Sequence, residues 1–179
     1  MLRTAICIPV LIQQNVDRSN FFNRSWAEYK VGFNSTNGNY WIGNDLLSQL
    51  TLSGNYKLRI ELQARDDSSL YWAEYSRFIV LGESSNYRLQ VSGHSGNIGG
   101  NGFSYHNGMM FTTYDRDNDP WINGTYNDNC AVFYGGGFWY KACSRCNVNA
   151  VRDRALNIIW WSQETGRLYM KSSRMWLTC

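Results

Sequence analysis

The sequence predicts an α+β domain in which a central antiparallel sheet with short helices is completed by an irregular, loop-rich lobe. Residues 56–64 alternate apolar and polar side chains with the period of two that is typical of a half-buried strand. Two short segments before them carry helix-start signals, whereas residues 93–137 are dense in glycine, asparagine and aspartate. A length of 179 residues suits one domain with a sizeable core.

Residues 10–92 are predicted to form the sheet core, which begins with a strand at 10–16. A short helix follows, because Ser25 and Glu28 have the spacing of a capping box. Gly32 supplies the stop signal of this helix.

A second short helix is predicted over residues 43–51, with Asn44 or Asp45 as its cap. Three leucines are expected on its buried side: Leu46, Leu47 and Leu50. The strand at 56–64 comes next, and its apolar side chains point to one face: Tyr56, Leu58, Ile60, Leu62 and Ala64.

After a turn at 66–69, strand-like segments at 71–80 and 86–93 extend the sheet, which is expected to carry its helices on one face. Residues 93–166 form the predicted lobe, since long irregular stretches in a domain need a staple, an ion or a function. Residues 167–179 are again strand-like, and we expect them to return to the first sheet.

Charge and hydropathy argue against two kinds of partner. The net charge of +3 is spread along the chain without a run of lysine or arginine, so nucleic-acid binding has no electrostatic footprint. The longest apolar run, residues 5–12, is too short to span a bilayer and contains Pro9, so membrane insertion is not expected. This run faintly resembles a signal peptide but lacks a small-residue cleavage site, and residues 1–9 are placed outside the domain.

Cysteines and glycosylation sequons favour an extracellular, secreted protein. The five cysteines are Cys7, Cys130, Cys143, Cys146 and Cys179. The candidate N-glycosylation sites are Asn23, Asn34 and Asn123. An odd number of cysteines leaves at least one thiol free or paired between chains.

Three aspartates lie on alternate positions in the lobe: Asp115, Asp117 and Asp119. Carboxylates this close repel one another unless a cation lies among them, and such oxygen donors suit Ca²⁺. An EF-hand is rejected, because Pro120 replaces the glycine required at its sixth position and Tyr126 the glutamate at its twelfth. Two interpretations stay open: another kind of calcium loop, or a solvated acidic turn.

The order of motifs resembles the fibrinogen C-terminal domain family, the globular module of fibrinogens, ficolins, tenascins, angiopoietins and tachylectins. Cys130 and Cys143 enclose twelve residues, a loop whose closure by a disulfide contributes about 3 kcal/mol. The matching stretches, in order, are SWAEYKVGF, YWIGNDLLSQLT, YKLRIEL, YRLQVSGHSGN, FSYHNGMMFTTYDRDND, NCAV, FWYKAC and LYMKSSRMWL.

The resemblance implies a fibrinogen C-terminal-like globular domain whose lobe binds Ca²⁺ as a cofactor. The implied metal-site residues are Asp115, Asp117, Asp119, Trp121 and Asn123. The first two give side-chain oxygens, Asp119 takes a less direct position, and Trp121 and Asn123 mark the region of two backbone carbonyl donors.

Relatives of the ficolin and tachylectin type bind N-acetyl groups in a slot beside the calcium site. The resemblance places this slot at Tyr134, Ala142, Cys143, Ser144, Arg154 and Ala155, beside a Cys130–Cys143 disulfide. It also implies a cis peptide before the second cysteine. Ser144 and Arg154 replace a family histidine and tyrosine, which weakens acetyl recognition and favours an anionic ligand such as a carboxylate or a sulfated sugar.

The remaining candidates have structural interpretations. Cys146 is expected to be a stray thiol or a partner for Cys179. The two histidines accompany no nucleophile motif, so no enzyme is predicted. Trp160 and Trp161 are expected to pack in the core.

The sequence therefore predicts a calcium-dependent extracellular recognition module that binds acetylated or anionic glycans, as lectins of innate defence do. The alternative is a protein–protein interaction module of the fibrinogen, angiopoietin or tenascin kind, which binds a peptide or receptor without sugar recognition. Self-association into a homo-oligomer is left open. Free acetylated sugars separate the first two hypotheses, because a receptor interface ignores them.

Overall fold

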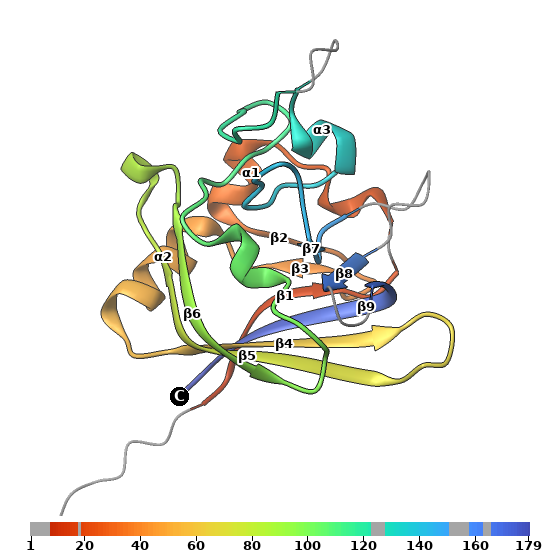
Figure 1. Cartoon of the computed structure of the whole chain (residues 1–179). Coiled ribbons are helices and arrows are strands. Elements are labelled where there is room, and N and C mark those ends of the chain that lie inside the picture. The colour runs from red at the N-terminus through yellow and green to blue at the C-terminus, as the bar shows by residue number, and fades with distance from the viewer. Residues whose placement is uncertain (1–7, 18, 123–127, 151–157, 163–165) are drawn as a thin grey trace, which may run out of the picture.

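One antiparallel sheet organises the molecule (Figure 1). The computed structural model describes residues 8–17, 19–122, 128–150, 158–162 and 166–179. Their strands are β1 (Val10–Asn15), β2 (Phe33–Asn34), β3 (Tyr40–Trp41), β4 (Lys57–Ala64), β5 (Leu70–Val80), β6 (Leu89–Gly96), β7 (Cys146–Asn147), β8 (Ile158–Ser162) and β9 (Gly166–Thr178). The order across the sheet is β2-β3-β1-β9-β4-β5-β6, with β8 paired to β9 and β7 paired to β8.

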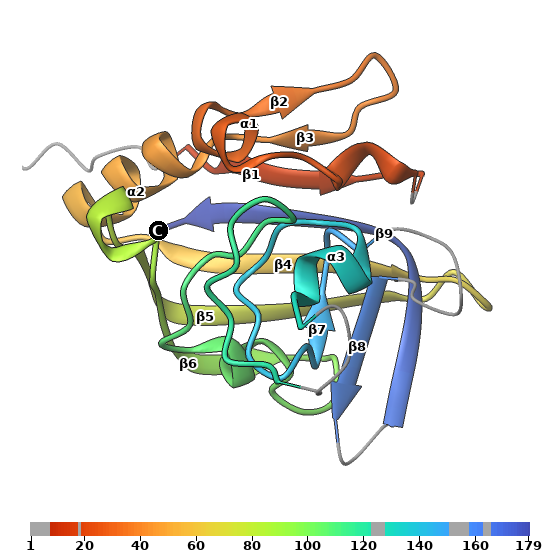
Figure 2. The ribbon, with the colours of Figure 1, turned by 90° about the horizontal axis from the view of Figure 1, so that it is seen from above.

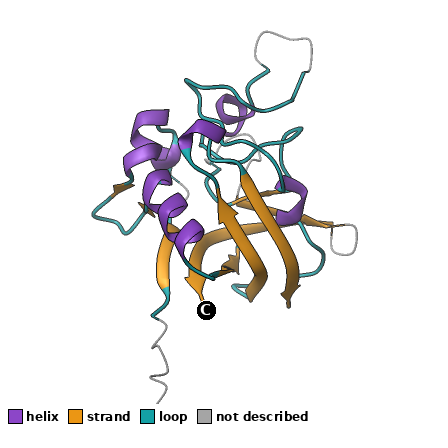
Figure 3. Cartoon of the chain, turned by 90° about the vertical axis from the view of Figure 1, so that its left-hand side faces the viewer, coloured by secondary structure: helices purple, strands orange, loops and turns teal. Residues whose placement is uncertain are grey.

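Short helices accompany the sheet on the same side of β4 and β5 (Figures 1 and 3). They are α1 (Trp26–Val31), α2 (Asn44–Ser53) and α3 (Cys130–Tyr134), with 3₁₀ turns η1 (Asn20–Phe22), η2 (Glu83–Ser85) and η3 (Phe103–His106). The predicted α+β class is thus confirmed. In the part of the chain that the structure describes, no helix is long and apolar enough to cross a bilayer.

The last strand of the described chain occupies the middle of the sheet. β9 pairs with β1, where Val10 faces Leu177, and with β4, where Lys57 faces Thr178. The segment 167–179 therefore returns to the first sheet as predicted. Its position means that β9 joins the N-terminal strands to the β4–β6 strands.

Helix α1 begins and ends as its sequence predicts. The Ser25 hydroxyl accepts a hydrogen bond from Glu28 N at 3.3 Å, and Glu28 Oε2 accepts one from Ser25 N at 2.9 Å, which completes the capping box. The chain leaves the helix through Gly32, whose φ is +93°. A Cβ at this position would lie 2.7 Å from the Ile42 carbonyl oxygen, so only glycine fits.

Helix α2 departs from the prediction at its start and on its buried face. Its N-cap residue is Gly43, because the Asn44 side chain accepts a hydrogen bond from Trp41 Nε1 at 3.1 Å instead of capping. Asp45 lies in the first turn and accepts a hydrogen bond from the Tyr87 hydroxyl at 2.5 Å. The buried residues are Asn44, Leu47, Ser48 and Thr51, whereas Leu46 is 44% exposed and Leu50 only partly buried.

The loop-rich lobe lies over one face of the sheet, and Figure 2 shows it from above with α3, β7 and β8. Its two short strands were not anticipated from the sequence. Trp160 in β8 is fully buried, as predicted for the core, but Trp161 is only partly buried. The alternation of faces along β8 explains the difference.

A seam of buried polar side chains holds the lobe against the sheet. We call it the amide seam, and its members are Gln13, Asn15, Asn147, Asn149 and Ser173, each at most 2% exposed. Gln13 Nε2 lies 3.1 Å from the Val148 carbonyl oxygen, 3.0 Å from Asn149 Oδ1 and 3.1 Å from Ser173 Oγ. Strand β1 is thereby joined to both the lobe and β9.

The rest of the seam binds backbone carbonyls and one side-chain hydroxyl of the lobe. Asn15 Nδ2 donates to the Val148 carbonyl at 3.1 Å, and Asn149 Nδ2 donates to the Gly137 carbonyl at 3.0 Å. Asn147 Nδ2 donates to the Tyr140 hydroxyl at 2.9 Å. Because these groups are removed from water, each bond satisfies a group that would otherwise be costly to bury.

Replacing Asn149 by alanine tests the seam. The substitution leaves the Gly137 carbonyl without this donor and removes one acceptor of Gln13. We expect the free energy of unfolding to fall by roughly 2–3 kcal/mol in a urea titration. The matched control is Asn20→Ala, at an exposed asparagine whose side chain makes no hydrogen bond to a described residue. Equal stability of the two variants would contradict a stabilising seam.

Candidate functional site

The loop that carries Asp115, Asp117 and Asp119 is called the aspartate loop, and it lies between α1 and α3. Its first aspartate is hydrogen-bonded to α1. Asp115 Oδ1 accepts hydrogen bonds from Trp26 N at 2.9 Å and from the Thr113 hydroxyl at 2.7 Å. Trp26 opens α1, so this carboxylate lies where the helix has unpaired N–H groups. One oxygen of Asp115 is therefore already used within the protein.

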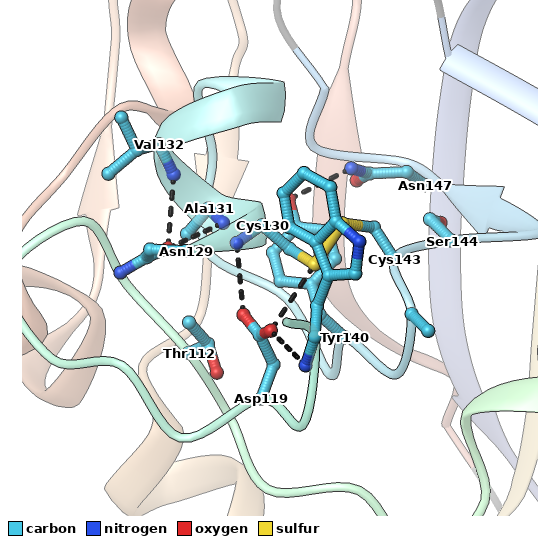
Figure 4. The surroundings of a disulfide bond; sticks show 12 residues. Thr112, Asp119, Asn129, Cys130, Ala131, Val132, Tyr140, Cys143, Ser144 and Asn147 are labelled. Atoms are coloured by element: carbon cyan, nitrogen blue, oxygen red, sulfur yellow. Dashed lines mark hydrogen bonds between the residues drawn. A yellow bond between two sulfur atoms is a disulfide. The ribbon is translucent and has the colours of Figure 1, made fainter. Parts of the chain in front are cut away.

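The second and third aspartates lie against each other. Asp117 Oδ1 accepts a hydrogen bond from Asp119 N at 3.2 Å. Asp119 in turn accepts from Trp121 N at 3.0 Å through Oδ1 and from Cys130 N at 3.0 Å through Oδ2 (Figure 4). This carboxylate thus fixes the start of α3 to the aspartate loop.

Asp119 is held in an environment that disfavours its charge. Burial raises the pKa of its carboxyl to about 6, and the charge of Asp117 acts in the same direction. The hydrogen bonds from Cys130 N and Trp121 N oppose this shift without cancelling it. A cation beside the two carboxylates would remove the penalty, so the donor chemistry fits a hard ion such as Ca²⁺.

The same residues limit what the site can offer a metal. Within the described ranges, no three histidine, cysteine, aspartate or glutamate side chains converge on one point. An ion at Asp117 and Asp119 therefore needs backbone carbonyl or water ligands as well. Trp121, predicted to mark such a carbonyl, lies two residues after Asp119, and its ring centre is 5.7 Å from that of Phe133. Asn123 lies outside the described residues.

The predicted disulfide is present between Cys130 and Cys143 (Figure 4). Its first cysteine opens α3, which Asn129 caps: Asn129 Oδ1 accepts hydrogen bonds from Ala131 N at 2.7 Å and Val132 N at 3.1 Å. Cys146 is a buried free thiol, whereas Cys179 is disulfide-bonded, so the predicted alternative of a Cys146–Cys179 pair is wrong.

The predicted ligand slot is only partly described. Tyr134 is partly buried and stacks on Tyr140 with a ring separation of 5.7 Å. Ala142 is exposed, and the Ser144 hydroxyl donates to the Cys146 carbonyl at 2.6 Å. The peptide between Ala142 and Cys143 is trans, so the cis bond implied by the family resemblance is not found here.

Two further slot residues, Arg154 and Ala155, lie outside the described residues. The contribution predicted for Arg154 as a cation therefore stays a prediction. Of the slot, the structure describes Tyr134 in α3 and the segment 142–144.

His106 is a structural residue of this region, and its role was not predicted from the sequence. Its Nδ1 lies 2.7 Å from the Trp139 carbonyl oxygen, which can only accept, so Nδ1 carries the proton. Its Nε2 then accepts from Arg145 N at 3.4 Å and Cys146 N at 3.3 Å. Burial lowers the pKa of His106 to about 4, so the ring is neutral at physiological pH.

The sheet with its disulfide-closed, aspartate-bearing lobe defines a fibrinogen-like globular domain. The family model for the C-terminal globular domain of fibrinogen beta and gamma chains matches residues 7–178. The chain therefore belongs to the fibrinogen C-terminal domain family, as its motifs had indicated.

Individual relatives support this assignment. The chain is 42% identical to the fibrinogen alpha chain of Rattus norvegicus over 79% of its length and 19% of the relative's. It is 40% identical to Ficolin-3 of Homo sapiens over 78% of its length and 45% of the relative's. Among solved structures, the fibrinogen-like globe domain of human ANGPTL2 gives a TM-score of 0.82 at 34% identity, covering 94% of this chain and 79% of that one. The chain thus spans less than half the length of these two curated relatives.

The neutral state of His106 predicts a pH dependence of stability. Because its folded pKa of about 4 lies below the ordinary value of 6.5, the unfolded state takes up the proton first as the pH falls. The stabilisation is present above pH 6.5 and is lost toward pH 4, by about 3 kcal/mol.

The measurement compares denaturant unfolding of the wild type and His106→Gln across this pH range. Asp119, whose pKa is raised, titrates with the opposite sign, so the difference between the two curves isolates the histidine. The two free energies should draw closer, or reverse in order, as the pH is lowered. Curves that stay parallel would show that His106 is not held neutral.

Proposed function

We propose that this domain is a calcium-dependent extracellular recognition module with lectin-like binding of acetylated or anionic glycans. The observation that carries the proposal is the half-buried Asp119 beside Asp117, because a bound cation would stabilise the charged form of these neighbouring carboxylates. Their loop is bonded through Asp119 to Cys130 of the disulfide, and Cys143 at its other end lies in the predicted ligand segment. An ion at this loop would therefore fix the backbone that presents the ligand site.

Asp117 and Asp119 are proposed as the side-chain ligands, with the backbone carbonyl of Trp121 beside them. Asp115, placed among the direct ligands by the family resemblance, is proposed instead to orient the loop, because Oδ1 already accepts two hydrogen bonds from Trp26 and Thr113. Bound Ca²⁺ would supply positive charge and rigidity. The chain's own residues hold the loop against α1 and α3.

The extracellular assignment rests on covalent chemistry. A disulfide joins Cys130 to Cys143, and such bonds persist in oxidising compartments. The sequon asparagines Asn23 and Asn34 are both exposed, so each can carry a glycan in the folded domain. The third, Asn123, lies outside the described residues. No enzymatic activity is proposed.

A second function is favoured by a separate observation. Apolar side chains are exposed beside the aspartate loop and on α3: Ile122 at 84%, Phe133 at 55% and Val132 at 42%. Exposed apolar groups gathered in one region are typical of protein-binding surfaces. A peptide or receptor bound there would make the domain a protein–protein interaction module.

Calcium binding is tested by thermal unfolding with Ca²⁺ and with EDTA. We expect Ca²⁺ to raise the unfolding temperature of the wild type. Asp117→Asn or Asp119→Asn should lower the affinity for Ca²⁺ by about tenfold or more. Affinity should also fall below about pH 6, because a proton then competes for Asp119.

Two further variants serve as controls in this experiment. Asp66→Asn changes an exposed carboxylate that is bonded to Arg65, and should leave the calcium effect intact. Asp115→Asn should lower stability in EDTA as well as in Ca²⁺, since it weakens the bonds to α1. A full calcium response in Asp119→Asn would sink the proposed site.

Ligand class is tested by retention on N-acetylglucosamine resin. We expect retention in Ca²⁺ and elution by free acetylated sugar. Retention should be lost in EDTA and in Tyr134→Ala. Tyr169→Ala is the control, because that ring lies on β9 and contacts Arg65. If calcium stabilises the protein but the resin does not retain it, the result would instead support the peptide or receptor alternative.

A further inference from the structure

A group of basic and aromatic side chains lies beside the disulfide. The Arg145 guanidinium carbon is 4.5 Å from the ring centre of Tyr105 and 4.6 Å from that of Trp161. Lys141 Nζ lies 5.0 Å from the Tyr105 ring centre. We call these four residues the basic–aromatic cluster. It comes from three separate parts of the lobe: η3, the segment around Cys143, and β8.

The cations of the cluster are exposed and have no anionic partner among the described residues. Lys141 and Arg145 are both exposed, and the ion pairs of the described chain involve other residues. Arg167 faces Trp161 across the β8–β9 pair and is also exposed without such a partner. Lys141, Arg145 and Arg167 are therefore three exposed positive charges near the Tyr105 and Trp161 rings.

Arg145 is held in place before any ligand arrives. Its carbonyl accepts a hydrogen bond from Trp161 N at 2.8 Å, and its amide donates to His106 Nε2 at 3.4 Å. The Tyr105 and Trp161 rings both contact the guanidinium, and its N–H groups bond no acceptor among the described residues. A planar fork fixed in this way loses little freedom on binding a carboxylate or sulfate.

We infer that the basic–aromatic cluster binds the sulfate or carboxylate groups of an anionic saccharide. The guanidinium edge can bind such a group through two parallel hydrogen bonds, with Lys141 adding a point charge. The partly exposed Trp161 and Tyr105 rings offer apolar surface to the C–H face of a sugar. Nucleic acid is the weaker alternative, because the net charge of +3 includes no run of basic residues.

The cluster adjoins the predicted acetyl slot. Lys141 and Arg145 flank Ala142, Cys143 and Ser144 in sequence, and the Tyr105 hydroxyl lies 3.5 Å from the Ala142 carbonyl oxygen. One oligosaccharide can therefore span both positions. The inference thus deepens the proposed function and rests on it for the class of ligand.

The test uses the full chain and a heparin-derived octasaccharide, with its desulfated, N-acetylated counterpart as the matched probe. Calorimetric titration should show binding of the sulfated probe that weakens with salt. Arg145→Gln should weaken it at least tenfold, and Arg145→Lys should give an intermediate loss because charge remains without the fork. Arg77→Gln is the control, since this exposed arginine lies on β5 and bonds to Gln90.

Each outcome decides the matter. Unchanged affinity of Arg145→Gln, equal binding of the two probes, or no binding of the sulfated probe by the wild type would overturn the inference. Tighter binding of a DNA duplex than of the octasaccharide would overturn the saccharide assignment. An unfolding temperature equal to that of the wild type shows that the variant is folded.

Repeating the titration in EDTA separates this inference from the proposed function. The cluster contains no carboxylate, so binding of the sulfated probe should persist in EDTA while retention on acetylated resin is lost. Failure on the resin alone counts against the acetyl slot, whereas failure of the sulfated probe alone counts against the cluster.

Discussion

The amide seam is the constraint on which the rest of the structure depends. The lobe contains little regular secondary structure, so many of its backbone groups have no strand or helix partner of their own. An amide side chain both donates and accepts, and Gln13 and Asn149 use this property to join β1 to the lobe by direct hydrogen bonds. The site loops are fixed to the sheet through these bonds.

Polar side chains also bond otherwise unpaired backbone groups at the aspartate loop. Asp115 accepts a hydrogen bond from the start of α1, and Asp119 accepts one from the start of α3. Asn129, the residue before α3, caps the same helix. Acidic and amide side chains suit helix starts because unpaired N–H groups lie there. The loop is thus a junction between two helices, and its charges are placed by local structure before any ligand is considered.

Local patterns in the sequence predicted local structure well. The alternation in β4 and the capping box of Ser25 needed only neighbouring residues, and both are found as expected. Helix-start rules predict Asn44 or Asp45 as the α2 cap because they do not consider the hydrogen bond that Trp41 donates to the Asn44 side chain. Trp161 was placed in the core because a pair of tryptophans does not show which of the two faces outward.

Long-range contacts account for what the sequence could not indicate. Gln13 and Asn149 are 136 positions apart, and nothing near either residue identifies the other. The hydrogen bonds of the buried His106 ring likewise join it to distant residues, Trp139 and Cys146. The ordered family motifs allowed the fold and the disulfide to be predicted, since they encode long-range structure through resemblance.

The central place of β9 has a consequence for how the protein is made. Strands β1 to β6 leave the ribosome first, but β1 and β4 do not pair with each other, since β9 lies between them. The nascent chain therefore carries two unjoined strand groups whose open edges invite wrong pairing until residue 178 has been synthesised. Pairing of β9 with both groups completes the sheet, so deletion of this strand would leave the β1–β3 and β4–β6 groups without the hydrogen bonds that join them.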